Sequence, residues 1–312
     1  MNRLLLSLFT AATVLIAACG GGSGSDATPA PSPSPAPSPA PAPSPAPAPS
    51  PAPAPSAAWR GPLKVSHQGV NVNVVVDKPA GNTFDVLLVY HGTVMRDDLI
   101  MAAANDTLDS FRRLIDDPTL MVVSVAYPEE NLMIGDNLTH AEAALLWVKN
   151  QAASQLGVQI RHIFLGGHSQ GGYLVTRLNT LHPTRGVIAN APGPLDLVLR
   201  CRLEEDGAIA DGEHCARLRN AYGTTAANPT AYMARSLRSF TTGYQADILF
   251  VQGLEDSRLI QMESWPGFRK QVEACTNCKG VQFLEVTGQG HPALFNSTQA
   301  RDVFRAFLNA RR

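Results

Sequence analysis

A serine surrounded by small residues is the strongest chemical signal in the chain. The motif Gly167-His168-Ser169-Gln170-Gly171-Gly172 follows the apolar run 163–165 and precedes a helical pattern. A serine nucleophile needs a tight turn that exposes its hydroxyl, and small residues two positions before and after it permit that turn. The first amides of the following helix favour negative charge. The motif therefore predicts a nucleophilic Ser169; an inert serine in a glycine-rich turn is the alternative.

A serine hydroxyl attacks poorly unless a base takes its proton. His291 follows the apolar run Val281–Val286, and Asp256 follows the run 248–252. The carboxyl ends of parallel strands share one edge of a sheet, so residues that follow different strands can meet there. We therefore predict that His291 is the base and that Asp256 orients it.

Other ionisable residues fit these two roles less well. Glu255 adjoins Asp256 and is a rival for orienting His291, whereas Asp247 lies at the opposite end of its strand. His168 adjoins the serine, and we expect its side chain to point away from the nucleophile. Four more histidines lie before the sheet core or at the ends of predicted elements: His67, His140, His162 and His182.

A reaction through a tetrahedral intermediate also needs two donors for the oxyanion. One is usually the backbone N–H of the residue after the nucleophile, here Gln170, and the other comes from a loop after a neighbouring strand. The apolar run 86–90 leads into His91-Gly92-Thr93. We predict Thr93 as the second donor, with Gly92 as the alternative, and a structural role for His91.

Alternating apolar and amphipathic stretches must position these residues. Most of the apolar runs are continuous, which indicates strands buried on both faces of a parallel sheet. Strands and helices that alternate predict an α/β fold with a doubly wound, mostly parallel sheet. The predicted strands are 72–77, 86–90, 120–126, 162–166, 186–190, 248–252 and 281–286, and the predicted helices are 98–115, 139–156, 170–181, 261–274 and 298–310.

The stretch 191–246, between the strands near 190 and 248, is too long for a simple crossover and predicts an inserted cap. Four cysteines lie in the predicted folded region, and an even number favours disulfides in an oxidising compartment. The simplest pairing is Cys201 with Cys215, inside the cap, and Cys275 with Cys278. A zinc site made by all four is the alternative, which the spacing of the first pair disfavours.

The first residues are typical of an export signal, with Arg3 before the apolar stretch 4–17. The stretch ends in Leu15-Ile16-Ala17-Ala18-Cys19-Gly20, which resembles the lipobox of bacterial lipoproteins. That resemblance implies cleavage after residue 18, a lipid on Cys19, and an outer-membrane location in a cell that has one. An ordinary signal peptide with an incidental cysteine is the alternative.

The composition changes sharply after the signal. Residues 28–56 are almost entirely Pro, Ala and Ser, with Pro at every odd position from Pro29 to Pro55, so this tract cannot build a core. We expect residues 1–18 to be the signal peptide, 19–56 a lipid-anchored linker and 57–312 one folded domain. The net charge of −1 gives no electrostatic footprint for nucleic acid.

With these pieces in order, the chain resembles the α/β-hydrolase superfamily over residues 72–308. The motif around Ser169, the order Ser-Asp-His and the helix with Ala143-Ala144-Leu145-Leu146-Trp147-Val148 are similar to the prolyl-oligopeptidase-like and dienelactone-hydrolase-like branches. The resemblance implies hydrolysis through an acyl-enzyme, without a metal or other cofactor, in a domain over 57–312. The chain lacks residues for a propeller and has Ser169 where dienelactone hydrolases have cysteine.

We therefore expect a small-molecule or polymer-borne ester as substrate, and contact with a membrane only through the lipid on Cys19. The alternatives are a serine peptidase of the same fold and a binding module of the cell envelope without catalysis. A cell-wall tether would rest on the Pro-Ala tract alone.

Overall fold

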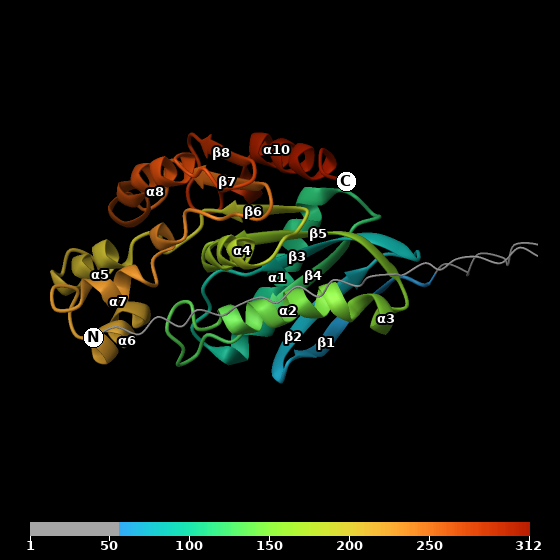
Figure 1. Ribbon diagram of the computed structural model, residues 1–312, viewed down its shortest axis with the longest axis horizontal. Coiled ribbons are helices and arrows are strands. Elements are labelled where there is room, and N and C mark those ends of the chain that lie inside the picture. Colours follow the sequence, from blue (N-terminus) through green and yellow to red (C-terminus); the bar gives the residue numbers. More distant parts are fainter. Residues whose placement is uncertain (1–55) are drawn as a thin grey trace, which may run out of the picture. The chain divides into compact units, whose positions relative to one another are not determined.

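The computed structural model of the protein describes residues 56–312 (Figure 1). The predicted signal peptide, the lipid on Cys19 and nearly all of the predicted linker lie outside the described residues. Among the described residues, no helix has the length and apolar character needed to cross a bilayer.

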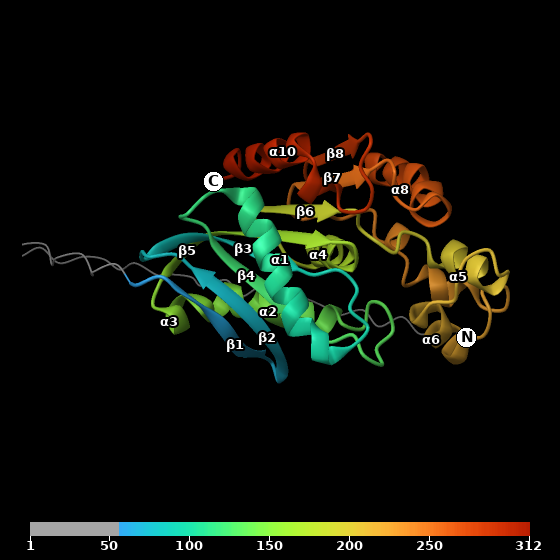
Figure 2. The same cartoon turned by 180° about the vertical axis from the view of Figure 1, so that it is seen from behind.

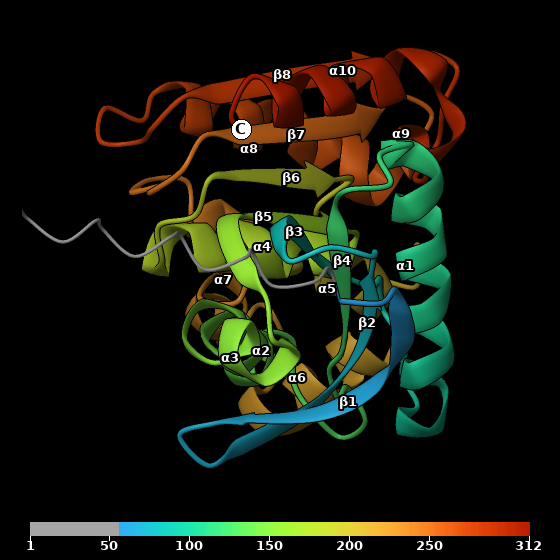
Figure 3. The same cartoon turned by 90° about the vertical axis from the view of Figure 1, so that its right-hand side faces the viewer.

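Eight strands form one sheet in the order β1-β2-β4-β3-β5-β6-β7-β8. Their bounds are β1 Trp59–His67, β2 Val70–Lys78, β3 Thr83–Tyr90, β4 Met121–Ala126, β5 Gln159–His168, β6 Gly186–Asn190, β7 Ile248–Gly253 and β8 Val281–Val286. From β4 to β8 all neighbouring strands are parallel, while β1 and β2 join the sheet antiparallel. The predicted doubly wound, mostly parallel sheet is confirmed, and Figure 3 shows its twist from β8 to β1.

The helices of the described region alternate with these strands along the chain. Their bounds are α1 Ile100–Ile115, α2 Leu138–Asn150, α3 Ala152–Leu156, α4 Gln170–Leu181, α5 Leu197–Glu205, α6 Glu213–Tyr222, α7 Pro229–Met233, α8 Glu263–Glu273, α9 Ala293–Asn296 and α10 Thr298–Asn309. Short 3₁₀ segments are η1 Asp97–Leu99 and η2 Leu237–Ser239, and η3 Arg258–Met262 is π-helical. The predicted helix 139–156 is interrupted at Gln151, whose backbone leaves the helical region.

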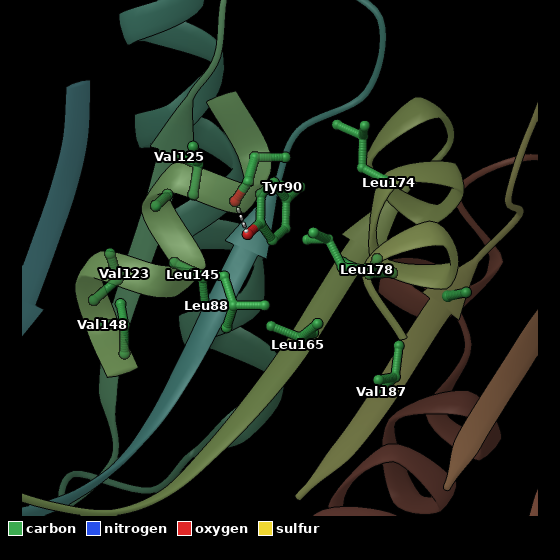
Figure 4. Close-up of a cluster of buried hydrophobic side chains, with 14 of the residues drawn as sticks. Leu88, Tyr90, Val123, Val125, Leu145, Val148, Leu165, Leu174, Leu178 and Val187 are labelled. Carbon is green, nitrogen blue, oxygen red and sulfur yellow. Dashed lines mark hydrogen bonds between the residues drawn. The ribbon is translucent and has the colours of Figure 1, made fainter. Parts of the chain in front are cut away.

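Helices cover both faces of the sheet, which explains the continuous apolar runs. Leu88 and Tyr90 of β3 belong to the core cluster that also holds residues of α2, α4 and α8, and Leu87 and Val89 belong to the cluster that holds residues of α1, α9 and α10. Figure 4 shows the first side, where Leu88 and Tyr90 lie beside Leu145, and Figure 2 shows α1 across the second. Both faces of β3 therefore require apolar side chains.

The sequence did not predict β1. This edge strand is exposed along most of its length, and Val65 is its one fully buried residue. An edge strand of this kind carries no apolar run, so its signal is lost among polar residues.

The predicted cap lies between β6 and β7 and contains α5, α6, α7 and η2, which gather beyond one end of the sheet (Figure 1). It has its own small core, in which Leu197, Leu218 and Tyr232 surround Cys201 and Cys215. These cysteines form the predicted disulfide between α5 and α6. The other predicted pair, Cys275 with Cys278, is also bonded.

The cap disulfide is expected to stabilise the protein more than the second one. Its cysteines are fully buried and 14 residues apart, whereas the second pair is 3 apart. A longer loop loses more chain entropy when it is closed in the unfolded state, about 3 kcal/mol for the first and about 2 kcal/mol for the second. In urea unfolding, Cys201→Ala/Cys215→Ala should therefore lose more stability than the matched Cys275→Ala/Cys278→Ala. An equal or smaller loss would contradict this account.

Candidate active site

The predicted nucleophile lies on a strained turn between β5 and α4. Ser169 has φ 57° and ψ −118°, a conformation that L-residues rarely adopt. The turn is also tightly packed: a Cβ on Gly167 would lie 2.1 Å from the carbonyl oxygen of Gly171, and a Cβ on Gly171 would lie 2.1 Å from that of Tyr90. Both positions therefore require glycine, as the motif indicated.

Asp256 and His291 come together at the same edge of the sheet. Asp256 follows β7, His291 follows β8, and Oδ2 of the aspartate lies 2.7 Å from Nδ1 of the imidazole. Both residues line a cavity of about 250 Å³ together with Ser169. Within the described region no hydrogen bond joins Ser169 to His291, and such bonds commonly tighten only when substrate binds. Among the described residues, the exposed side chain of Glu255 makes no hydrogen bond or ion pair with His291.

The environment of Asp256 favours its ionised form. Its side chain is 6% exposed, and burial raises the pKa. Hydrogen bonds outweigh that effect and lower the pKa below its ordinary value: the carboxylate binds His291 and accepts from Nε2 of Gln252 and from the amide of Ser257. A charged Asp256 can hold Nδ1–H of His291 and stabilise a protonated ring.

A chain of buried amides fixes this carboxylate. Gln252 is fully buried and donates to Asp256 Oδ2 at 3.0 Å, while its own oxygen accepts from Gln261 at 2.9 Å. Gln261 also donates to the carbonyl oxygen of Pro192, which follows β6. Neither glutamine could be identified from the sequence as a positioning residue, because a glutamine near a strand end has many possible partners.

The neighbour of the predicted nucleophile contacts the predicted base. The rings of His168 and His291 lie 4.8 Å apart between centroids, a contact that the sequence did not predict. Burial and, to a lesser extent, the nearby His291 lower the pKa of His168 to about 4, so its ring is neutral. Asn190 holds it, with Nδ2 lying 2.8 Å from His168 Nδ1.

Asn190 makes two further hydrogen bonds around the turn. Its backbone oxygen accepts from the amide of Ser169 at 2.9 Å, and its side-chain oxygen accepts from the amide of Leu294 in α9 at 3.1 Å. The side chain is fully buried at the end of β6. One residue therefore ties the serine turn to the segment that follows His291.

The two predicted oxyanion donors lie near each other. Gln170 is the first residue of α4, so its N–H has no acceptor within the helix. The hydroxyl of Thr93 donates to Gln170 Oε1 at 2.9 Å, and Thr93 lines the same cavity as Ser169. Gly92, the alternative donor, is also close, since a Cβ there would lie 3.3 Å from that of Ser169.

His91 has the structural surroundings expected of it. Its buried ring stacks on Tyr127 at 3.9 Å between centroids, and Nδ1 lies 2.7 Å from the carbonyl oxygen of Gly92. Burial lowers the pKa of His91 to about 4, which keeps the ring uncharged. The stacked pair holds the turn that leads to Thr93.

A carboxyl that the sequence did not single out supports the loop with Thr93. Glu129, after β4, is 1% exposed, and its Oε2 accepts from the amide of Val94 at 2.8 Å. Its own amide donates to Asp97 of the same loop. Burial raises the pKa of Glu129 to about 8. The signal available in the sequence was an acidic residue three positions after the end of an apolar run.

The cap completes the cavity. Arg200 of α5 and His214 of α6 line it opposite the sheet, with Ile134 from the β4–α2 loop. Neither polar residue was a candidate in the sequence, where they stand directly before Cys201 and Cys215 in a segment of unknown conformation.

Comparison with known proteins gives the fold its name. The sequence matches no protein-family model and no curated protein. Solved structures match over about four-fifths of the chain, at low identity. Est1E from Butyrivibrio proteoclasticus is 14% identical with a TM-score of 0.57, over 80% of this chain and 98% of its own. A hyperthermophilic esterase from the archaeon Pyrobaculum calidifontis is 16% identical with a TM-score of 0.58, over 82% and 83%.

An acylaminoacyl peptidase from Pyrococcus horikoshii is 12% identical with a TM-score of 0.55, and the match covers 82% of this chain but 42% of the peptidase. At these identities the likeness concerns the fold. The described region has the α/β-hydrolase fold, as the sequence predicted.

The raised pKa of Glu129 predicts how stability depends on pH. An unfolded glutamate ionises near its ordinary pKa of 4.5, whereas the folded protein holds the proton up to about pH 8. Glu129 therefore makes its full contribution to the free energy of unfolding below pH 4.5, and this contribution is lost as pH rises through 8. Glu129→Gln keeps an uncharged group there and should remove this loss.

The measurement is urea unfolding of both proteins at pH 5, 6.5 and 8. Other titrating groups are common to both, so the difference between the two free energies of unfolding isolates Glu129. The variant should gain relative to the wild type as pH rises. A difference that stays constant with pH would contradict the account.

Proposed function

We propose that the protein is a serine hydrolase that cleaves carboxylic esters through an acyl-enzyme. The observation that carries the proposal is the hydrogen bond between His291 and Asp256 beside Ser169, which stands on a strained turn in the wall of the same cavity. A buried, ionised carboxylate that fixes an imidazole near such a serine is the arrangement that activates a hydroxyl.

The reaction proceeds in two halves. Oγ of Ser169 attacks the ester carbonyl carbon while Nε2 of His291 takes the hydroxyl proton, and Asp256 holds Nδ1–H and stabilises the charged ring. The amides of Gln170 and Thr93 bind the oxyanion. When the C–O bond breaks, His291 gives the proton to the leaving alcohol. Water then attacks the acyl-enzyme with the same base, releasing the acid and restoring the serine.

The comparison favours esters over peptides. The match covers nearly all of Est1E and most of the Pyrobaculum esterase, but less than half of the acylaminoacyl peptidase. A peptidase of the same fold is the second candidate, and p-nitroanilides of amino acids assayed beside p-nitrophenyl esters separate the two. A protein that folds and binds without turnover is the outcome that would favour the binding module.

Ser169→Ala should abolish labelling by a fluorophosphonate and reduce kcat for p-nitrophenyl butyrate at least about a thousandfold, because the nucleophile is lost. Asp256→Asn should reduce kcat to a similar extent, since it removes the charge that stabilises protonated His291. Mass spectrometry locates the label, and steady-state kinetics measures the turnover.

Glu255→Gln is the matched control, because it changes the neighbouring carboxylate of the same turn. It should leave kcat within about twofold, as expected of an exposed substitution. Wild-type protein that folds but takes up no label would overturn the proposal, and a larger loss in Glu255→Gln than in Asp256→Asn would reassign the carboxylate.

We also propose that the enzyme is exported and anchored in the bacterial cell envelope by a lipid on Cys19. The support is the lipobox-like sequence before Cys19 and the two disulfides, which fit an oxidising compartment. Cys19→Ser should move the protein from the membrane fraction to the soluble fraction. Membrane association that persists in this variant argues for a different anchor.

A further inference from the structure

Two polar side chains of the cap, Arg200 and His214, line the cavity with nitrogen atoms that no protein group in the described region binds. His214 is 7% exposed, and neither of its ring nitrogens has a hydrogen-bond partner in the described region. Burial lowers the pKa of His214 to about 4, so the ring is neutral and offers one donor and one acceptor. Buried polar atoms in proteins are rarely left unsatisfied. A ligand in the cavity would satisfy this ring.

Arg200 lines the same cavity, and only one of its three guanidinium nitrogens has a hydrogen-bond partner in the described region. Its Nε donates to Oε1 of Glu204 at 3.3 Å, and the second oxygen of that buried carboxylate accepts from the amide of Gly212 at 2.9 Å. Among the described residues, no hydrogen bond uses the two Nη atoms of Arg200. The outer edge of the guanidinium, which is the edge that grips a carboxylate in two-point contacts, is therefore available.

The cap disulfide holds Arg200 and His214 close to each other. Arg200 directly precedes Cys201 on α5, and His214 directly precedes Cys215 on α6. The bond keeps the two Cα atoms of the cysteines 5.2 Å apart, so it also brings together the helix turns that carry the arginine and the histidine. A site built from two helices gains definition from such a link.

Charge in the cavity complements an anion. The one carboxylate among the lining residues, that of Asp256, is bound to His291, to the side chain of Gln252 and to the amide of Ser257. Glu204 is occupied by Arg200 and Gly212. The guanidinium edge of Arg200 is thus the charged group of the wall that lacks a protein partner in the described region.

We propose that Arg200 and His214 form a subsite for a carboxylate of the substrate, so that the enzyme prefers esters whose acyl or alcohol part carries a free carboxylate. The inference rests on the proposed ester hydrolysis at Ser169, and it adds the chemical class of the substrate. The carboxylate binds the guanidinium edge and accepts the ring N–H of His214, while the ester carbonyl lies at Ser169.

The test compares charged and neutral esters of matched size. Mono-p-nitrophenyl adipate against p-nitrophenyl hexanoate places the carboxylate on the acyl side, and 4-acetoxybenzoate against its methyl ester places it on the alcohol side. The measured quantity is the ratio of kcat/KM for the charged ester to that for the neutral one. Calorimetric binding of adipate gives a second readout that needs no turnover.

The variants separate the subsite from general charge effects. Arg200→Met alone would leave Glu204 buried without its partner, so the double variant Arg200→Met/Glu204→Gln is used with it. Arg202→Met removes one positive charge from the exposed side of the same helix and is the matched control. His214→Phe keeps an aromatic ring without the nitrogens.

In at least one of the two ester pairs, the ratio should fall about ten- to hundredfold in both Arg200 variants, as expected for the loss of a charge-assisted hydrogen bond. It should fall several-fold in His214→Phe and stay unchanged in Arg202→Met. Adipate binding should weaken in parallel with the ratio.

The subsite is overturned if the ratio is the same in wild type, in both Arg200 variants and in Arg202→Met. That result would not affect the proposed ester hydrolysis at Ser169. If adipate binding depends on Arg200 but the protein hydrolyses no ester, the subsite is supported and the proposed reaction is overturned. Absence of both turnover and adipate binding overturns the two together.

Discussion

The hydrogen bonds of Asn190 are the constraint on which the rest of the site depends. This fully buried residue ends β6, between the strand that leads to Ser169 and the strand that leads to Asp256. Its backbone oxygen, side-chain nitrogen and side-chain oxygen bond the serine turn, the ring of His168 and the segment after His291. Because a buried amide with unmet hydrogen bonds is costly, these three segments are fixed relative to one another.

Around this centre the supporting groups divide into two sets. On one side, Gln252 and Gln261 hold the carboxylate of Asp256 through buried amide groups. On the other, Glu129 holds the loop that presents Thr93, through the amide of Val94. The two glutamines keep the carboxylate of Asp256 in place, and Glu129 keeps the backbone of the loop with Thr93 in place. Gln252 lies at the end of β7, and Gln261 and Glu129 lie in the segments that follow β7 and β4, at one edge of the sheet.

The sequence predicted the parts of this structure that repeat a physical pattern. Strands buried on both faces give continuous apolar runs, so the central strands were found, whereas β1 was not, because only Val65 is buried along it. The serine turn was recognisable because its close approaches exclude every residue but glycine at Gly167 and Gly171. Asp256 and Glu255 are adjacent on one turn, and only the conformation of that turn decides which side chain meets His291. The roles of Arg200 and His214 depend on how two cap helices pack, which no periodicity of the sequence records.

The cap has a core of its own. The apolar residues of α5, α6 and α7 cluster around Cys201 and Cys215 together with Ile134 of the β4–α2 loop, whereas Leu237 of η2 belongs to a cluster on the sheet. Arginines of the cap also bind backbone oxygens of that loop: Arg217 donates to those of Glu129 and Leu132, and Arg235 donates to that of Ile134. Backbone oxygens are present whatever the side chains are, so these contacts do not depend on the side chains of Glu129 and Leu132. The side chains of this loop that stay outside the cap core can therefore change without loss of the arginine contacts that hold the cap to the loop.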